Sequence, residues 1–268
     1  MMHSRILRVQ GLATSVLGRS LKQTKIWSLL ALLIFAGCDS GLDCSLASGG
    51  KTTYIVDVAD FSKLTVYPRV AVVLIDSPTR EVRVETTENL VDELEITVTD
   101  GRLELRENTT CNVLRDYAAT TIFVSSPGLT EVRNASNLSV SSQGTLDWDA
   151  LTLITENTQD EDLSRDGTFD LDLDLDNLRI VTNGPAVYQL RGTATIAHFG
   201  TFAGDGRILA RDLVISDLDI LHSGTNIHEA TVTNSVTGTL SSVGDFRVSG
   251  NPTDIRVEEL FTGRLILD

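Results

Sequence analysis

The stretches IVTNG (180–184), GTFAG (200–204), ILHSG (220–224) and LSSVG (240–244) recur at intervals of 20 residues. Such a period is typical of a β-solenoid, which forms one coil per repeat around an apolar column. Glycine suits the corners of such a coil because it accepts positive φ angles. The corners are therefore expected at Gly184, Gly204, Gly224 and Gly244, and the apolar column at Ile180, Gly200, Ile220, Leu240 and Leu260. Ile220 and Leu240 should be stacked neighbours in that column.

Upstream of the repeats, residues 51–126 consist of short runs rich in Val, Ile, Leu and Thr, separated by turn residues. Asp100-Gly101 predicts a hairpin turn, and TENLVDEL (87–94) is at most one helical turn. The sequence thus predicts an all-β protein. We expect a right-handed parallel β-helix-like solenoid with coils of about 20 residues over 127–268, preceded by a short β-layer region over 51–126, with 51–268 as one continuous domain.

The first 37 residues differ from the rest of the chain. A basic segment precedes IWSLLALLIFAG (26–37), an uncharged run that is shorter than the ~20 residues needed to span a bilayer. This pattern favours a secretory signal peptide over 1–37. The following FAGC resembles a bacterial lipobox, although Phe35 stands where Leu is usual.

We therefore expect lipidation at Cys38 after cleavage, followed by a tether over 38–50, on a protein exported to the bacterial cell envelope and held on its inner or outer membrane. An ordinary signal peptide with a chance cysteine and an uncleaved anchor are the alternatives.

The chain is strongly acidic, with 22 Lys plus Arg against 37 Asp plus Glu and a formal charge of −15. Loss of residues 1–37, which carry five basic residues and no acidic one, would lower the charge to −20. Such a surface repels phosphate backbones, so nucleic acid is excluded as a partner. The contact with the membrane would then depend on the N-terminal lipid rather than on a basic patch.

Two cysteines would remain in the exported domain, Cys44 and Cys111. Because exported proteins meet an oxidising compartment, we expect a disulfide between them. The loop that it closes would stabilise the fold by ~4 kcal/mol. The alternative is that both are buried free thiols.

Two glycine-rich stretches invite comparison with phosphate-binding loops. FGTFAGDGRILA (199–210) lacks the G-x-G-x-x-G pattern and a strand-to-helix context. SGGKTT (48–53) ends like a Walker loop, but Ser45 stands where the first glycine belongs. No G-x-S-x-G motif is present either. We therefore expect no nucleotide site and no α/β-hydrolase site.

Acidic residues alternate with leucines in FDLDLDLDN (169–177). At the period of a strand, Asp170, Asp172, Asp174 and Asp176 share one face and the leucines share the other. A solvated outer face is the preferred interpretation. Weak Ca²⁺ binding by these carboxylates is the alternative, completed by a neighbouring coil or by the acidic residues of 160–166, and otherwise no cofactor is expected.

The histidines His198, His222 and His228 are interpreted as surface residues, because a zinc site would need tighter convergence. Trp148 would stack on a sugar if exposed, but a core position is commoner for a tryptophan.

Three segments carry a resemblance to a known family: Val58–Glu107, TIFVSSPGLTEVRNASNLSVSS (121–142) and LSSVGDFRVSGNPTDIRVEELFTGRLIL (240–267). Together they resemble the bacterial family named "putative auto-transporter adhesin, head GIN domain", over about residues 55–267. The chain departs from the family's Ser-Gly corners with TNGPA (182–186) and FAGDG (202–206). The resemblance implies a β-helix-like envelope protein and supplies no catalytic residues.

Three functions are open at this point. The first is a non-catalytic envelope lipoprotein, an adhesin or scaffold that binds a protein or glycan. The second is a self-assembling structural element of the envelope. The third is a polysaccharide-active enzyme that uses clustered carboxylates such as Asp172 and Asp174.

The substitution Cys38→Ser tests the anchor. Since the thiol is the acylation site in a lipobox, the variant should lose acyl labelling, keep its unprocessed mobility and no longer be matured. Metabolic labelling with a fatty acid analogue measures this, with Cys44→Ser as the control that should label normally. Unchanged labelling of the Cys38 variant would contradict the prediction.

Overall fold

A computed structural model describes residues 49–109, 120–156 and 164–268 of the chain, and these belong to one compact unit. Apart from one short 3₁₀ helix, all regular elements in this part of the chain are strands, so the all-β prediction is confirmed. Cys38, Cys44 and Cys111, with the predicted signal peptide, lie outside the described residues. Among the described residues, no helix has the length and apolar character to cross a membrane.

The N-terminal elements form a mixed β layer. β5 and β6 make an antiparallel hairpin whose turn, Asp100-Gly101, has φ angles of 51° and 73°. β1–β4 and β4–β7 are also antiparallel, whereas β2–β6, β2–β8 and β3–β7 are parallel. The elements are β1 (Lys51–Val56), β2 (Lys63–Val66), β3 (Val70–Asp76), β4 (Glu81–Thr87), η2 (Glu88–Glu93), β5 (Leu94–Thr99), β6 (Arg102–Glu107), β7 (Thr120–Ser126) and β8 (Glu131–Asn134).

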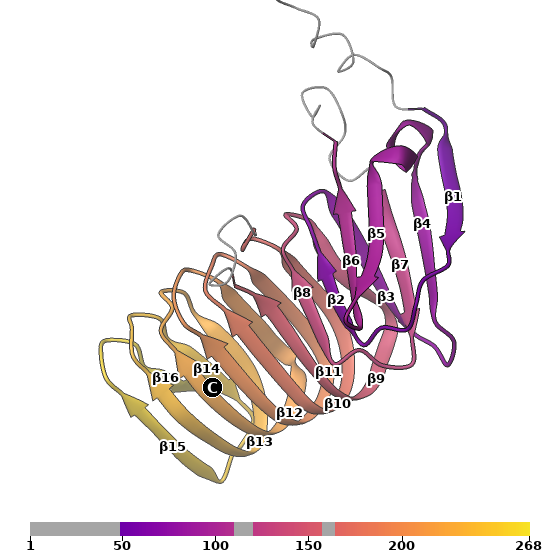
Figure 1. Ribbon diagram of the computed structural model, residues 1–268. Coiled ribbons are helices and arrows are strands. Elements are labelled where there is room, and N and C mark those ends of the chain that lie inside the picture. Colours follow the sequence, from indigo (N-terminus) through magenta and orange to yellow (C-terminus); the bar gives the residue numbers. More distant parts are fainter. Residues whose placement is uncertain (1–48, 110–119, 157–163) are drawn as a thin grey trace, which may run out of the picture. The chain divides into compact units, whose positions relative to one another are not determined.

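The C-terminal part is a stack of long parallel strands (Figure 1). Neighbouring strands pair in register, so Phe169 lies beside Tyr188 and Val187 beside Arg207. The strands are β9 (Ser139–Thr155), β10 (Thr168–Thr182), β11 (Val187–Thr201), β12 (Arg207–His222) and β13 (His228–Leu240), followed by the shorter β14 (Phe246–Ser249), β15 (Asp254–Glu259) and β16 (Leu265–Leu267).

At each end of the stack, one long strand pairs with two different shorter strands. The first half of β9 pairs with β3, and its second half pairs with β8. Likewise β13 pairs with β14 through its first half and with β15 through its second half. The pairing therefore joins the N-terminal layer and the repeat region in one 16-stranded sheet with a single hydrophobic core.

The predicted apolar column is buried at Ile180, Ile220 and Leu240, but it is wrong at Leu260, which is 58% exposed, and wrong in register. Ile220 and Leu240 are buried, with exposed fractions of 1% and 0%. However, Ile220 lies opposite Gly238, and Leu240 lies opposite His222. The β12–β13 pairing shifts at two points, so the distance between equivalent residues falls below the 20 positions that the sequence suggests.

Two glycines inside the strands, rather than at the corners, meet the strictest backbone constraint. Gly192 and Gly238 have φ angles of 103° and 127°, which residues with a side chain rarely adopt. A Cβ atom on either would overlap the carbonyl oxygen of the preceding strand, at Leu173 and Ile220 respectively. These positions thus require glycine for close strand approach, and a search for corner glycines does not find them.

A buried polar seam runs through the core where the long strands meet the connections between them. Thr155 Oγ1 donates to Thr182 Oγ1 at 2.8 Å and lies 2.7 Å from the hydroxyl of Tyr188. The next strands continue the seam, with Thr201 Oγ1 at 2.7 Å from Nε2 of His228. The seam comprises Thr155, Thr182, Tyr188, Thr201, His222 and His228, all of which are buried.

The expectation of surface histidines is correct for His198 and wrong for the other two. His222 and His228 are 0% and 1% exposed, and their ring centroids are 4.0 Å apart. The amide of Ile208 donates to Nδ1 of His228 at 3.3 Å, so Nε2 carries the proton that faces Thr201. The two rings come together across the short connection between β12, which His222 ends, and β13, which His228 begins.

Replacement of Ile220 by Asp tests the core position. A buried carboxylate without a partner should lower the free energy of unfolding by roughly 3–5 kcal/mol. Thermal and urea denaturation measure the loss. The matched control is Leu221→Asp at the next, 40% exposed position, which should stay close to the parent protein. Equal melting curves for parent and Ile220 variant would contradict the assigned register.

The histidine pair predicts a loss of stability in mild acid. Burial, reinforced by neighbouring His222, lowers the pKa of His228 to about 3, and burial also lowers the pKa of His222. Unfolded histidine has a pKa of about 6.5. Between these values only the unfolded chain binds the proton, so stability is full above about pH 6.5 and falls as the pH drops, by up to ~1.4 kcal/mol per unit for each group.

The substitution His228→Gln, which keeps a donor for Thr201, should flatten this dependence between about pH 6.5 and 5, above the range in which most carboxylates titrate. Urea unfolding of parent and variant at a series of pH values gives the two slopes. His198→Gln, at the exposed histidine, is the control and should keep the parent slope. Identical slopes for all three proteins would overturn the prediction.

Candidate functional site

The acidic strand β10 has the two faces that the sequence predicts. Leu171, Leu173 and Leu175 are at most 3% exposed and belong to the core. On the opposite face, Asp174 and Asp176 are exposed and Asp170 and Asp172 are half-buried. The carboxylates therefore line the outside of the stack.

The guanidinium of Arg191, on the neighbouring strand, pairs with two of these carboxylates. Arg191, on β11, places Nη1 2.6 Å from Oδ1 of Asp170 and Nε 2.8 Å from Oδ1 of Asp172. Hydrogen bonds to Asp172 and then Asp170 raise the pKa of the Arg191 guanidinium, which stabilises its charge. Thr193 donates to Asp174 at 2.5 Å. Asp170 and Asp172 thus share the positive charge of Arg191 from the next strand, which argues against Ca²⁺ at this pair.

The same pattern of cross-strand bonds continues onto β12 and β13. Asn234 donates to Asp217 at 2.7 Å, and Thr237 donates to Asp219 at 3.1 Å. Nδ1 of His198 lies 3.5 Å from Oδ2 of Asp219. Asp217 and Asp219 are thus each held by a side chain of a neighbouring strand. We call the outward-facing surface of β9 to β13 the outer face.

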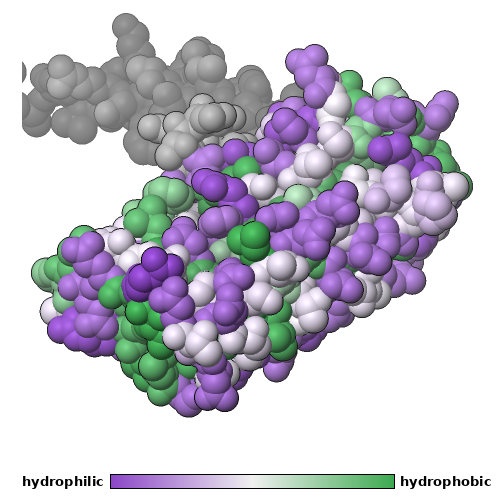
Figure 2. Space-filling model, turned by 90° about the horizontal axis from the view of Figure 1, so that it is seen from below, coloured by the Kyte–Doolittle hydropathy of each residue, from purple (hydrophilic) through white to green (hydrophobic). Residues whose placement is uncertain are grey.

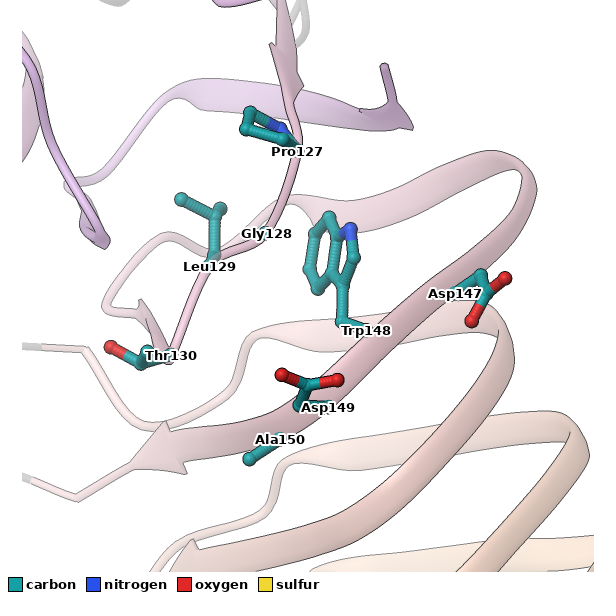
Figure 3. A pocket seen from close by; sticks show the side chains of 8 residues that line it. All are labelled: Pro127, Gly128, Leu129, Thr130, Asp147, Trp148, Asp149 and Ala150. Atoms are coloured by element: carbon teal, nitrogen blue, oxygen red, sulfur yellow. The ribbon is translucent and has the colours of Figure 1, made fainter. Parts of the chain in front are cut away.

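An acid-lined hollow lies at the edge of the outer face, between β9 and the β7–β8 connection. Figure 3 shows Trp148 rising from β9 toward Gly128, with Asp147 and Asp149 on either side of it along the strand. The hollow has a volume of about 230 Å³. Its lining residues are Pro127, Gly128, Leu129, Thr130, Asp147, Trp148, Asp149 and Ala150.

Trp148 forms a wall of this hollow rather than a stacking platform. The indole is only 5% exposed, and Nε1 donates to Oδ1 of Asp76 at 3.0 Å. The exposed carboxylates that line the hollow are those of Asp147 and Asp149. Because small-molecule pockets usually measure ~300–1,000 Å³, the hollow suits a side chain or one sugar unit of a larger partner.

A second, more apolar hollow lies at the corner after β11. It has a volume of about 320 Å³ and is lined by Glu156, Val181, Asn183 and Phe202. Phe202 is 50% exposed. Glu156 is engaged by Arg133, with Nη2 at 2.9 Å from Oε1.

The four predicted corner glycines all lie in connections between strands of the stack. Only Gly204 of the four has a positive φ angle, 89°. The others are constrained by close backbone approach, since a Cβ on Gly184 would lie 2.8 Å from the carbonyl oxygen of Arg165. The amide of Gly244 donates to the carbonyl of Gly224 at 3.2 Å, which stacks one connection on the next. Their role as solenoid corners stays a prediction.

The described residues contain no group of three or more His, Cys, Asp or Glu side chains placed to hold a metal ion. Asp172 and Asp174, the carboxylates of the enzyme hypothesis, are bonded to Arg191 and Thr193 on an open strand face.

Sequence reasoning missed the contribution of Asp147, Asp149 and Arg191 to this surface. A signal for Arg191 is nevertheless present, because it lies about one repeat of the sequence beyond Asp170 and Asp172, and it pairs directly with Asp172. Asp147 pairs with Asp174 in the same way. Aligning the sequence repeat by repeat would have joined these residues.

Several solved structures share this fold. A putative adhesin from Bacteroides fragilis is 20% identical, with a TM-score of 0.70 over 82% of this chain and 97% of that one. A putative lipid binding protein from Parabacteroides distasonis is 18% identical, with a TM-score of 0.57 over 81% and 97% of the two chains. A putative adhesin from Parabacteroides merdae is 17% identical, with a TM-score of 0.53 over 82% and 98%.

No curated protein sequence matches the chain. A family model does match, over residues 60–252, within the range in which the sequence resembles that family. The match spans well over half of the chain, and the resemblance stated from the sequence is thereby confirmed. The chain belongs to the family described as "Putative auto-transporter adhesin, head GIN domain".

Proposed function

We propose that the protein is a non-catalytic lipoprotein of the bacterial cell envelope, anchored through Cys38, that acts as an adhesin or binding scaffold. Membership of the adhesin family supports the general role. The observation that carries the proposal is the outer face, on which carboxylates and hydroxyls of successive coils are fixed by cross-strand bonds such as Asp174–Thr193 and Asp219–Thr237. Side chains ordered before binding lose less entropy when a partner docks.

The charge of the outer face narrows the partner to a neutral glycan or a basic protein. Asp147, Asp149, Asp174 and Asp176 are exposed carboxylates on adjoining strands, and the chain as a whole is acidic. Such a face repels sulfated and phosphorylated partners. The hollow beside Trp148 would take one group of the partner while the strands bind the rest.

A binding role fits this surface better than catalysis. Glycosidases place two carboxyl groups on opposite sides of an enclosed bond, ~5–9.5 Å apart. Here Asp172 and Asp174 project from one face of a single strand, and each already accepts a bond from the next coil. The openness of the face favours an extended partner that stays intact.

We infer further that the stacked strands form a right-handed solenoid with coils of about 20 residues. The in-register pairing of Phe169 with Tyr188 and of Val187 with Arg207 supports this coil length. Both ladders contribute to one core, as expected for the inside of a coil. Parallel crossovers are right-handed in ~98% of cases, which supports the hand.

Binding of the purified protein to immobilised neutral glycans, sulfated glycans and basic proteins tests the proposed function. We expect binding to a neutral glycan or a basic protein and none to the sulfated panel. The double variant Asp147→Asn/Asp149→Asn should bind about tenfold more weakly, a loss of ~1.4 kcal/mol.

The control is Glu81→Gln/Asp92→Asn, which removes two exposed carboxylates from the N-terminal layer and should bind like the parent. Equal binding by both double variants would show that the hollow is not the site. Shortened glycan products after incubation would contradict a non-catalytic role.

A further inference from the structure

The C-terminal end of the stack leaves two strand edges open. β15 pairs with β13, and β16 pairs with β14; neither has a second partner among the strands of residues 49–268 that the structure describes. The outer N–H and C=O groups of such an edge can pair with a strand from another chain.

Exposed apolar side chains gather at this same end. Ile255 lies on β15, Leu260 and Phe261 directly follow it, and Leu267 lies on β16, with exposed fractions of 39%, 58%, 59% and 56%. Val243, one coil earlier, is 48% exposed. In Figure 2, hydrophobic groups lie among hydrophilic ones at the left end of the molecule, the end at which Figure 1 labels β15 and β16. Clustered exposed apolar groups of this kind mark interaction sites.

The charges of β15 are arranged so that the strand complements itself. Asp254, Arg256 and Glu258 alternate with Ile255 and Val257, so the charged residues share one side of the strand. Directly opposite residues of an antiparallel pair lie on the same side of the sheet, which restricts the allowed registers. With two copies centred on Val257, Arg256 of each lies opposite Glu258 of the other.

We propose that β15 pairs antiparallel with β15 of a second copy of this chain, about a two-fold axis at Val257. The neighbouring register centred on Arg256 would oppose the two arginines, and the one centred on Glu258 would oppose two glutamates. Like charges directly opposite destabilise a sheet. The register centred on Ile255 would pair Arg256 with Asp254 and is the rival arrangement.

A two-fold pairing also explains why the occupant should be a second copy rather than an unrelated strand. An isologous contact satisfies both edges at once and closes, so it does not propagate into fibres. The exposed Leu260 and Phe261, which extend β15, would be covered at the two ends of the shared ladder.

Cysteine cross-linking of the full-length chain in cells tests the register. In the Val257→Cys variant the two new thiols would be directly opposite, within the 4.4–6.8 Å Cα range of disulfides. A dimer that reducing agent dissolves should therefore form, beyond any seen with the parent chain. In Ile255→Cys the two copies of residue 255 would be about 13 Å apart by strand geometry, so that variant should give no additional dimer. Cross-linking of Ile255→Cys alone would select the rival register and overturn this one.

Charge reversal in the Val257→Cys background supplies the second measurement. Arg256→Glu alone and Glu258→Arg alone should each reduce the dimer several-fold, and the double reversal should restore it. Pull-down of an untagged parent copy by a tagged parent copy reports the association without any substitution. Failure of that pull-down, or a double reversal no better than the single ones, would overturn the proposal.

Discussion

The C-terminal stack depends on in-register backbone pairing between parallel strands that follow one another along the chain. This pairing places Thr155, Thr182, Thr201 and His222 one above another. At the tightest points the approach excludes a Cβ atom, as at Gly192 and Gly238. Because the backbone bonds fix the spacing between strands, the buried side chains must fit the space that this spacing leaves.

The same pairing allows polar groups to occupy the interior. A buried hydroxyl or imidazole is destabilising unless it has a partner. In the seam the partner is supplied by another strand of the stack, as Thr182 and Tyr188 are for Thr155 and Thr201 is for His228. His222 has a less complete environment, since its Nδ1 has no hydrogen-bond partner among the described residues. The seam therefore stabilises the stack near neutral pH and weakens it in acid.

The alternation of side chains could be predicted from the sequence, and the exact pairing could not. The leucines and aspartates of β10 segregate as a period of two requires. The 20-residue period located the connections between strands, but register shifts within the β12–β13 pair moved Leu240 from Ile220 to His222. Such shifts are bulges or irregularities within the strand pairing, which leave no simple mark in composition. Uncertainty of register hid the cross-strand partner Arg191 at the acidic strand. The contact between His222 and His228 was missed because it depends on the path of the connection between β12 and β13.

This architecture also explains how chains with 17–20% identity share one fold. The stacking of strands constrains two kinds of residue. Inward side chains must be apolar or have a hydrogen-bond partner inside the core, and a few positions where backbones come close must be glycine. Outward residues such as Asp147 and Asp149 meet no such requirement. Selection for binding can therefore change the outer face without disturbing the core. On the function proposed above, the partner of this protein is therefore set by the side chains of its own outer face, and not by the fold that it shares with its relatives.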